Sequence, residues 1–230
     1  MRHQWAHLLF LHWAVPVEAV RPLVPRELDI DMFDGQAYIG LIPFTMTGVR
    51  MSGLPAVPWF SRAHEVNVRT YVHRQGGDPG VWFFSLDINH RLAYWGARRF
   101  FHLPYQYARM CLEKTDGSAL RIDYASERLA PGPRPADCRL CYEVQGEPAP
   151  VEPGTLEHFL IERYILYAQT GTNLYLGRVH HPPYPVQRGR LLSLDESLLA
   201  AAGIVRPDTP PLVHYAEGVS VRVNPLRRVK

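Results

Sequence analysis

The sequence predicts a mainly β (α+β) fold, a curved antiparallel sheet or barrel with a few helices packed on it. Strand-like runs outnumber helical ones, and most of these runs are joined by tight turns. The chain has 230 residues, of which 47% are hydrophobic and 20% are charged. A chain of this size can bury roughly 70% of its unfolded surface. No linker or repeat divides it, so we expect one domain over 1–230.

The N-terminal part predicts a strand, a short helix and a hairpin. The apolar run 7–15 is typical of a buried strand. The segment 16–28 predicts a short helix, because one proline opens it and Pro25 closes it. The segment 28–44 predicts a hairpin, since Asp34 and Gly35 supply turn chemistry between two strand-like runs. We expect the proline-rich segment 53–59 to be a loop.

The clearest pattern in the chain is a second hairpin. Residues 64–74 alternate between polar and aliphatic side chains, a glycine-rich turn follows, and 81–88 return as the partner strand. Residues 90–101 then have the spacing of a short helix, which Pro104 ends.

The second half of the chain predicts mostly strands. Thr155 is placed to cap a helix that begins the segment 155–168, and 193–203 predict a helix that ends at Gly203. The remaining strands are expected at about 105–113, 118–129, 138–146, 173–181 and 212–223.

Charge and hydropathy exclude several classes of function. The net charge is +3, but no run of five basic residues occurs, so we expect no nucleic-acid partner. No segment approaches the ~20 unbroken apolar residues of a membrane helix, so we expect no membrane partner. His7 and His12 interrupt the apolar N-terminal stretch, which argues against a signal peptide. A cytoplasmic location follows as the expectation.

No motif for a cofactor or a metal is present. Phosphate-binding glycine loops, dinucleotide fingerprints and zinc motifs are all missing from the sequence. Cys138 and Cys141 are three positions apart on an expected strand, so their side chains diverge and are expected to be buried and structural. His180 and His181 are neighbours on a strand and face opposite sides, which disfavours a shared metal. We expect no metal and no cofactor.

One strand carries a polar face that could belong to a site. Glu65, Asn67, Arg69 and Tyr71 point to one side, while the aliphatic residues between them point to the other. The polar face could meet water, as in an ordinary half-exposed strand. It could instead face an enclosed cavity inside a barrel. The sequence leaves both interpretations open.

The order of several motifs resembles the YqjF-like family of uncharacterised bacterial proteins, which is related to acetoacetate decarboxylase. The motifs are "FLHWAVP", "FDGQAYIGLIPF", "HEVNVRTYV", "GVWFFSLDI", "RRFFHLPYQYA", "ERYILYA" and "VHHPPYP", and the resemblance runs from about residue 5 to 220. It implies the decarboxylase-like fold, an antiparallel cone-like β barrel that encloses a small cavity. Fold alone does not fix the reaction.

The resemblance also places individual residues. Glu65 resembles the pocket glutamate of the decarboxylases, and Arg98 and Pro104 resemble parts of their catalytic segment. Tyr105 and Gln106 stand where the decarboxylases have two lysines. A phenol or an amide cannot form the Schiff base that the parent reaction uses. The N-terminal arginine of the decarboxylases has no clear counterpart near Trp13 and Ala14 either.

We therefore expect a protein that binds or transforms a small organic molecule, anionic or aromatic, without a Schiff-base lysine. The expected catalytic residues are Glu65, Arg98 and Tyr105, with Glu65 as general acid or base and an arginine holding an anionic ligand. The expected ligand-binding residues are Asn67, Arg69, His102 and Gln106.

Two alternatives remain open at this point. The chain could be a non-catalytic binding or sensing module that kept the barrel and lost the chemistry. It could also be a lysine enzyme that uses Lys114, although this lysine lies in a turn-like segment and Lys230 ends the chain. The oligomeric state is open, with a homo-oligomer among the options.

Overall fold

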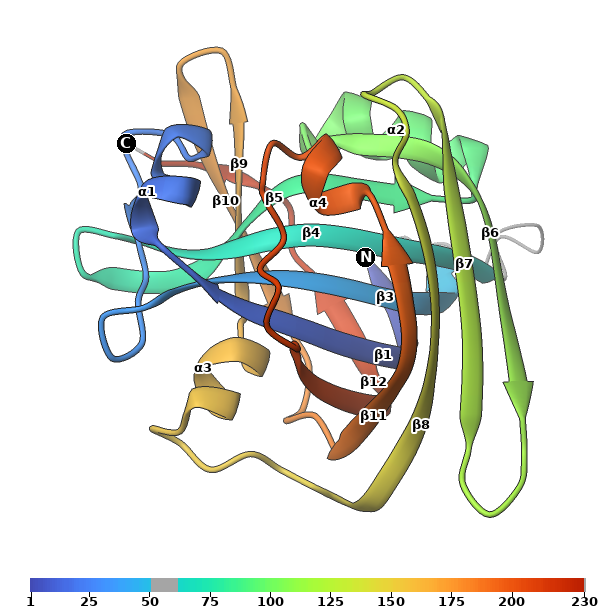
Figure 1. The fold of residues 1–230 in the computed structure, drawn as a ribbon. Coiled ribbons are helices and arrows are strands. Elements are labelled where there is room, and N and C mark those ends of the chain that lie inside the picture. The colour runs from blue at the N-terminus through green and yellow to red at the C-terminus, as the bar shows by residue number, and fades with distance from the viewer. Residues whose placement is uncertain (51–61, 230) are drawn as a thin grey trace.

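The computed structural model describes residues 1–50 and 62–229, and the chain is mainly β (Figure 1). The helices are α1 (Val17–Val20), followed by a 3₁₀ turn at Arg21–Leu23, α2 (Arg91–Phe101), α3 (Leu156–Ile161) and α4 (Leu198–Ala201). The strands are β1 (Arg2–Val15), β2 (Asp29–Ile30), β3 (Ala37–Arg50), β4 (Arg62–Arg74), β5 (Gly77–Ile88), β6 (Tyr105–Thr115), β7 (Arg121–Ala130), β8 (Asp137–Ala149), β9 (Ile165–Thr170), β10 (Asn173–His180), β11 (Val186–Glu196), β12 (Leu212–Val223) and β13 (Arg227–Arg228).

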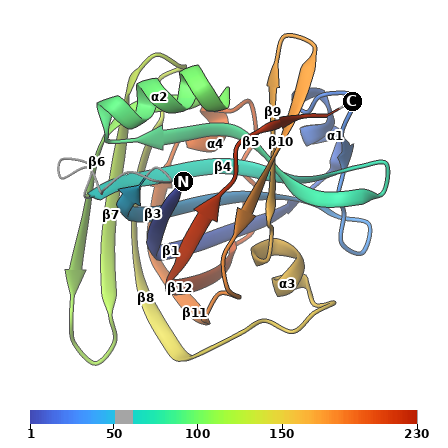
Figure 2. The same ribbon diagram turned by 180° about the vertical axis from the view of Figure 1, so that it is seen from behind.

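All the described strands belong to one large sheet. Its order is β13-β10-β9-β5-β6-β7-β8-β11-β12-β1-β3-β4-β2, with further pairings of β10 to β12 and of β5 to β4. Figure 2 shows β9, β10 and α3 on one side of the central strands β1, β3 and β4. The sheet is mixed, because β5 pairs in parallel with both β6 and β9. The expected antiparallel sheet is therefore corrected at β5, where the crossover helix α2 lets β6 run parallel to β5.

The N-terminal predictions are partly confirmed. The predicted strand 7–15 lies within β1, and the helix expected at 16–28 is reduced to α1 and its 3₁₀ turn. The turn at Asp34 and Gly35 is present, with positive φ at both residues. The hairpin itself is wrong, because β2 pairs with β4 while β3 pairs with β1 and β4. The loop expected at 53–59 lies outside the described residues.

The second hairpin and the helix after it are confirmed. β4 and β5 pair antiparallel around the turn at Gln75 and Gly76. The side chain of His90 caps α2 by accepting a hydrogen bond from the backbone N–H of Ala93, and the helix ends at His102, which has a left-handed conformation. β6 begins directly after Pro104.

The elements after residue 105 agree only partly with those predicted from the sequence. Thr155 caps α3 as expected, by accepting a hydrogen bond from the backbone N–H of His158. The helix expected at 193–203 is mostly wrong, since Ser193–Glu196 continue β11 and pair with β8, leaving a helix of one turn. The five strands expected between 105 and 223 are all present, as β6, β7, β8, β10 and β12.

Two hydrophobic clusters lie on opposite faces of the central strands. Alternate residues of β1 divide between them, with Leu9 and Leu11 in the first cluster and Leu8 and Phe10 in the second. This division is what alternation along a strand requires when both faces are covered. The central strands therefore place side chains in two separate interiors.

Candidate functional site

The polar face of β4 is buried. Glu65 and Asn67 are 2% and 4% exposed, and Arg69 is 9% exposed. The aliphatic residues between them pack in the first hydrophobic cluster, while Tyr71 belongs to the second. The interpretation of β4 as a half-exposed strand with a water-facing polar side is therefore wrong. The strand instead carries a row of buried polar side chains, which we call the β4 row: Glu65, Asn67, Arg69 and Tyr71.

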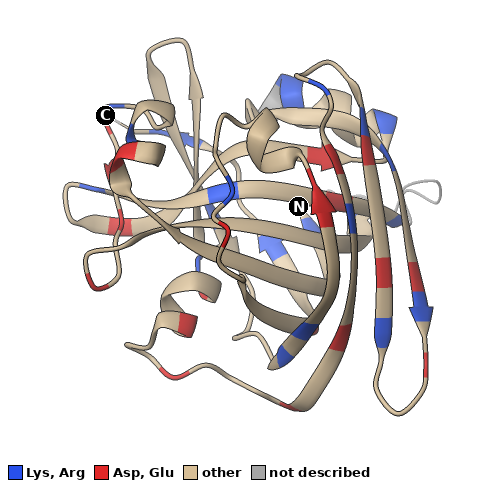
Figure 3. Ribbon diagram, in the orientation of Figure 1, with Lys and Arg blue, Asp and Glu red and all other residues tan. Residues whose placement is uncertain are grey.

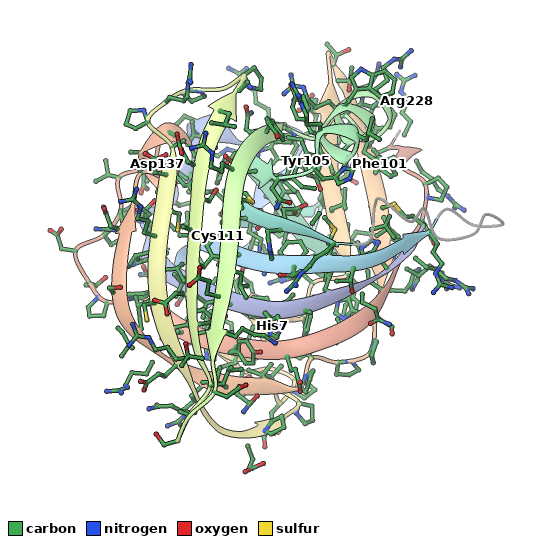
Figure 4. All side chains as sticks on the ribbon, turned by 90° about the vertical axis from the view of Figure 1, so that its right-hand side faces the viewer. His7, Phe101, Tyr105, Cys111, Asp137 and Arg228 are labelled. Carbon is green, nitrogen blue, oxygen red and sulfur yellow. The ribbon has the colours of Figure 1, made fainter. Side chains whose placement is uncertain are left out.

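Glu65 is hydrogen-bonded to Tyr105. The Tyr105 hydroxyl donates to Glu65 Oε2 at 2.8 Å. The pairing of β4 with β5, and of β5 with β6, brings the two residues together: Glu65 lies opposite Ile88, and Tyr105 lies beside Leu86. Figure 4 shows Tyr105 close to Phe101, where the chain leaves α2 and enters β6.

Burial makes Glu65 a weak acid. It raises the pKa of Glu65 from 4.5 to about 8, while the hydrogen bond from Tyr105 opposes the rise and the nearby Asp87 adds to it. Burial and the adjacent carboxyl also raise the pKa of Tyr105 well above its ordinary value. At neutral pH the pair is therefore mostly a neutral carboxylic acid and a neutral phenol. A carboxyl group in this state can give a proton to a bound molecule.

Arg69 is a buried cation without a carboxylate partner among the described residues. One terminal nitrogen donates to the backbone oxygen of Leu160 at 3.0 Å and to the Tyr71 hydroxyl at 3.4 Å. The guanidinium lies over the rings of Phe10 and Tyr71, at 5.9 and 5.5 Å from their centroids. Its Nε has no hydrogen-bond partner, and neither has the side-chain oxygen of Asn67. A buried guanidinium is costly to desolvate unless an anion compensates it.

Tyr71 and His12 continue the polar group from β4 to β1. The Tyr71 hydroxyl donates to the backbone oxygen of Leu160 at 2.7 Å and lies 2.7 Å from His12 Nε2. Since the hydroxyl has one proton, we assign the proton of His12 to Nε2, which then donates to Tyr71. Burial and Arg69 lower the pKa of His12 well below its ordinary value. His12 is therefore neutral, and its Nδ1 has no hydrogen-bond partner.

A second acid near the β4 row is already engaged. Glu162 accepts hydrogen bonds from the backbone N–H of Tyr184 at 2.9 Å and from the Tyr164 hydroxyl. The His181 ring stacks on Tyr164 and contacts Tyr184. These bonds occupy both carboxylate oxygens, so Glu162 orders this region and is less suited than Glu65 to exchange a proton with a ligand.

The remaining predicted residues lie around a different feature. Arg98, His102 and Gln106 line an open depression of about 620 Å³ between α2, β5 and β9. Arg98 is exposed and donates to the backbone oxygen of Tyr105 at 2.8 Å. Gln106 accepts from the backbone N–H of Gly132 at 2.7 Å. Gln106 points away from Tyr105, as neighbours on a strand do. Of the predicted residues, Glu65, Asn67 and Arg69 thus share the buried β4 row, and Tyr105 is hydrogen-bonded to Glu65 at one end of it. Arg98, His102 and Gln106 lie instead at the depression, and Arg98 contacts Tyr105 only at its backbone.

Sequence reasoning did not place His12 or Tyr71 in the site. The available signal was His12 inside the apolar run 7–15, because a buried ring nitrogen needs a partner. Tyr71 shares the polar face of β4, but the pattern alone could not tell a hydrogen-bonded phenol from an ordinary core tyrosine. Glu162 carried no signal of its own.

The described residues contain no group of three or more His, Cys, Asp or Glu side chains placed to hold a metal ion. Lys114 is exposed at the end of β6, and Lys230 lies outside the described residues. Among the helices of the described part, none has the length and apolar character that crossing a bilayer requires.

Solved structures of other proteins share the fold of this chain. The biosynthetic enzyme MppR in complex with pyruvate has a TM-score of 0.68 at 14% identity, covering 100% of this chain and 90% of that one. An acetoacetate decarboxylase-like enzyme from Sphingomonas wittichii RW1 has a TM-score of 0.67 at 13% identity, covering 100% and 92%. The acetoacetate decarboxylase of Legionella pneumophila has a TM-score of 0.64 at 10% identity, covering 100% and 88%. The chain has the acetoacetate decarboxylase-like fold.

Sequence comparison then gives the family. Residues 2–220 match the model of DUF2071, described as an uncharacterized conserved protein. The chain is also 42% identical over 228 residues to the uncharacterized protein YqjF of Bacillus subtilis strain 168, covering 99% of this chain and 92% of that protein. The chain belongs to the DUF2071 family, and the predicted YqjF-like resemblance is confirmed.

Proposed function

We propose that this protein binds a small organic acid at the β4 row and transforms it by non-covalent proton transfer, without a Schiff-base lysine. Arg69 holds the carboxylate of the ligand, Asn67 donates or accepts a hydrogen bond beside it, and Glu65 with Tyr105 forms the proton-transfer end. The observation that carries the proposal is the buried Arg69 without a carboxylate partner among the described residues, on the same strand face as the buried Glu65.

The chemistry of the row supports this proposal. A guanidinium binds a carboxylate through two parallel hydrogen bonds, and Arg69 Nε has no partner in the free protein. A carboxylic acid with a pKa near 8 is matched to proton transfer at neutral pH. One protein of similar fold is described as holding pyruvate, which is a small carboxylate of this kind.

The alternative is a non-catalytic binding or sensing module. It uses the same contacts to Arg69 and differs only in that the ligand leaves unchanged. The Tyr71 hydroxyl is hydrogen-bonded to both His12 and the backbone of Leu160. These bonds hold this end of the β4 row rigid, which favours a binding module. Measuring binding and turnover of the same acid separates the enzyme from the binding module.

The test is titration with pyruvate and phenylpyruvate by isothermal titration calorimetry, while NMR of the ligand follows turnover. Arg69→Met should weaken binding by about tenfold or more, as loss of a charged hydrogen-bonding partner does. The control Arg109→Met removes one exposed arginine and should bind normally. Equal binding by the Arg69 variant, or absence of binding of either acid to the unmodified protein, would overturn the assignment.

Glu65→Gln separates catalysis from binding. If the protein is an enzyme, this variant should bind the acid and lose turnover. If the unmodified protein binds without turnover, the sensing alternative holds. Borohydride treatment with the keto acid should leave the protein mass unchanged, whereas an adduct on Lys114 would establish the lysine mechanism.

Two finer expectations accompany this proposal. We infer that the closed path of strand pairings, from β5 through β6, β7, β8, β11, β12, β1, β3 and β4 back to β5, forms the cone-like barrel of this fold class. We also propose a cytoplasmic location, which the free thiols of Cys111, Cys138 and Cys141 support.

A further inference from the structure

Strand pairing sets three arginines side by side at one end of the sheet. Arg2 on β1 lies opposite Arg222 on β12 and opposite Arg50 on β3, and His180 on β10 lies opposite Arg222. Residues directly opposite one another in a sheet present their side chains on the same face. We call Arg2, Arg50 and Arg222 the arginine row.

The arginine row has no ion pair within the described residues, in contrast to arginines elsewhere in the fold such as Arg128 and Arg163. Like charges directly opposite on neighbouring strands are destabilising. The segment 51–61, which follows Arg50, contains no aspartate or glutamate in its sequence. Figure 3 shows acidic and basic residues interspersed over the ribbon. The concentration of positive charge therefore arises from strand register and not from a basic run.

The arginine row borders a depression of about 610 Å³. Its lining contains no acidic residue.

His3 also lines the depression, with its side chain on the opposite face of β1 from that of Arg2. It is only 6% exposed, and neither of its ring nitrogens has a hydrogen-bond partner. Burial lowers the pKa of His3 to about 4, so the ring is neutral and offers one donor and one acceptor. His181 also lines the depression with an unpartnered Nε2. Buried polar groups of a folded protein normally have partners, so these nitrogens are able to bond a ligand in the depression.

We propose that this depression binds a small molecule that carries a diphosphate or triphosphate group. Three guanidinium groups match an anion with several negative charges, and each can bind two phosphate oxygens at once. Neighbouring strands lie ~4.8 Å apart, so the backbones of Arg222 and Arg50 are ~10 Å apart and their long side chains can converge on one diphosphate. The volume lies within the range of small-molecule sites, roughly 300–1,000 Å³.

This site is separate from the β4 row. His181 lines the depression and also packs on Tyr164 and Tyr184 beside Glu162. Within the described residues, no hydrogen bond, ion pair or ring contact joins the arginine row to Glu65 or Arg69, so the two proposals can fail independently.

The experiment is titration of the full chain with inorganic pyrophosphate by isothermal titration calorimetry, without divalent metal. We expect micromolar to submillimolar binding, weakened about tenfold or more by Arg2→Gln and by Arg222→Gln. Arg109→Gln removes the same charge at a distant exposed site and should change the dissociation constant by less than about twofold. Arg69→Met should bind pyrophosphate normally, which separates this site from the one for organic acids.

Thermal unfolding gives the second readout. Without ligand, Arg2→Gln should melt at the same temperature as the unmodified protein or higher, because a like-charge neighbour has been removed. Lost binding in a variant of undiminished stability cannot be explained by unfolding. Absence of pyrophosphate binding, equal weakening by Arg109→Gln, or citrate binding as tightly as pyrophosphate would overturn the proposal. Tighter binding of a short RNA, lost in Arg2→Gln, would also overturn it, in favour of a nucleic-acid site.

Discussion

Replacing Glu65 by glutamine should stabilise the protein at neutral pH and leave its stability unchanged near pH 4. The carboxyl of Glu65 has a pKa of about 8 in the folded protein against 4.5 as its ordinary value. Between these values the folded state keeps a proton that the unfolded state has released, so stability falls as pH rises. The loss begins near pH 4.5 and is complete near pH 8. At pH 7 it amounts to about 3 kcal/mol for a shift of this size.

Glutamine removes this loss because it is neutral in both states and can still accept the hydrogen bond from Tyr105. The assay is urea unfolding of both proteins at several pH values between 4 and 8, with the difference in unfolding free energy plotted against pH. The control is Glu147→Gln at an exposed position, which should give a small difference without this rise. A constant difference between pH 4 and 8, or a less stable glutamine variant at pH 7, would refute the reasoning.

Two further predictions concern the rest of the interior. Arg128→Met should destabilise the fold by about 3–5 kcal/mol in urea unfolding, because Arg128 makes two bonds of 2.7 Å to Asp87 and both side chains are buried. Asp87→Asn combined with Arg128→Met should recover part of this loss, and a cost below about 1 kcal/mol for the single variant would contradict the assignment. In thiol labelling of the native protein, exposed Cys111 should react first while Cys138 stays unreactive, since Cys138 is buried and burial raises its pKa. Equal labelling rates would show that the interior opens easily.

The local sequence pattern was sufficient to predict a strand or helix when the pattern lies within that element itself. The alternation along 64–74 and the turn after it predict β4 and its pairing with β5, and Pro104 predicts the end of α2. The local pattern predicted the wrong secondary structure where pairing with a distant strand determines it. Ser193–Glu196 have helical sequence around them, yet pairing with β8 holds them as strand.

The candidate site was likewise predictable only in part from the sequence. Glu65, Asn67 and Arg69 share a strand face, so alternation groups them, and the family resemblance added Tyr105. Whether that face meets water or an interior depends on what packs over it, and here α3 and β1 do so through Leu160 and His12. The arginine row was beyond prediction for the same reason, since it requires the register of strands that lie far apart in the sequence.

The spacing of the β4 row also restricts the ligand. Glu65 and Arg69 are four residues apart on one strand, which separates their backbones by ~13 Å at a rise of ~3.3 Å per residue. The Arg69 guanidinium contacts Tyr71 and Leu160, on the side away from Glu65. A molecule as short as pyruvate can therefore contact one end of the row at a time, whereas an acid with an aromatic body can span it past Asn67. The rings of Phe10 and Tyr71 beside Arg69 offer that body an apolar surface. If one ligand engages both ends, phenylpyruvate should bind more tightly than pyruvate, and the advantage should shrink when Glu65 is replaced.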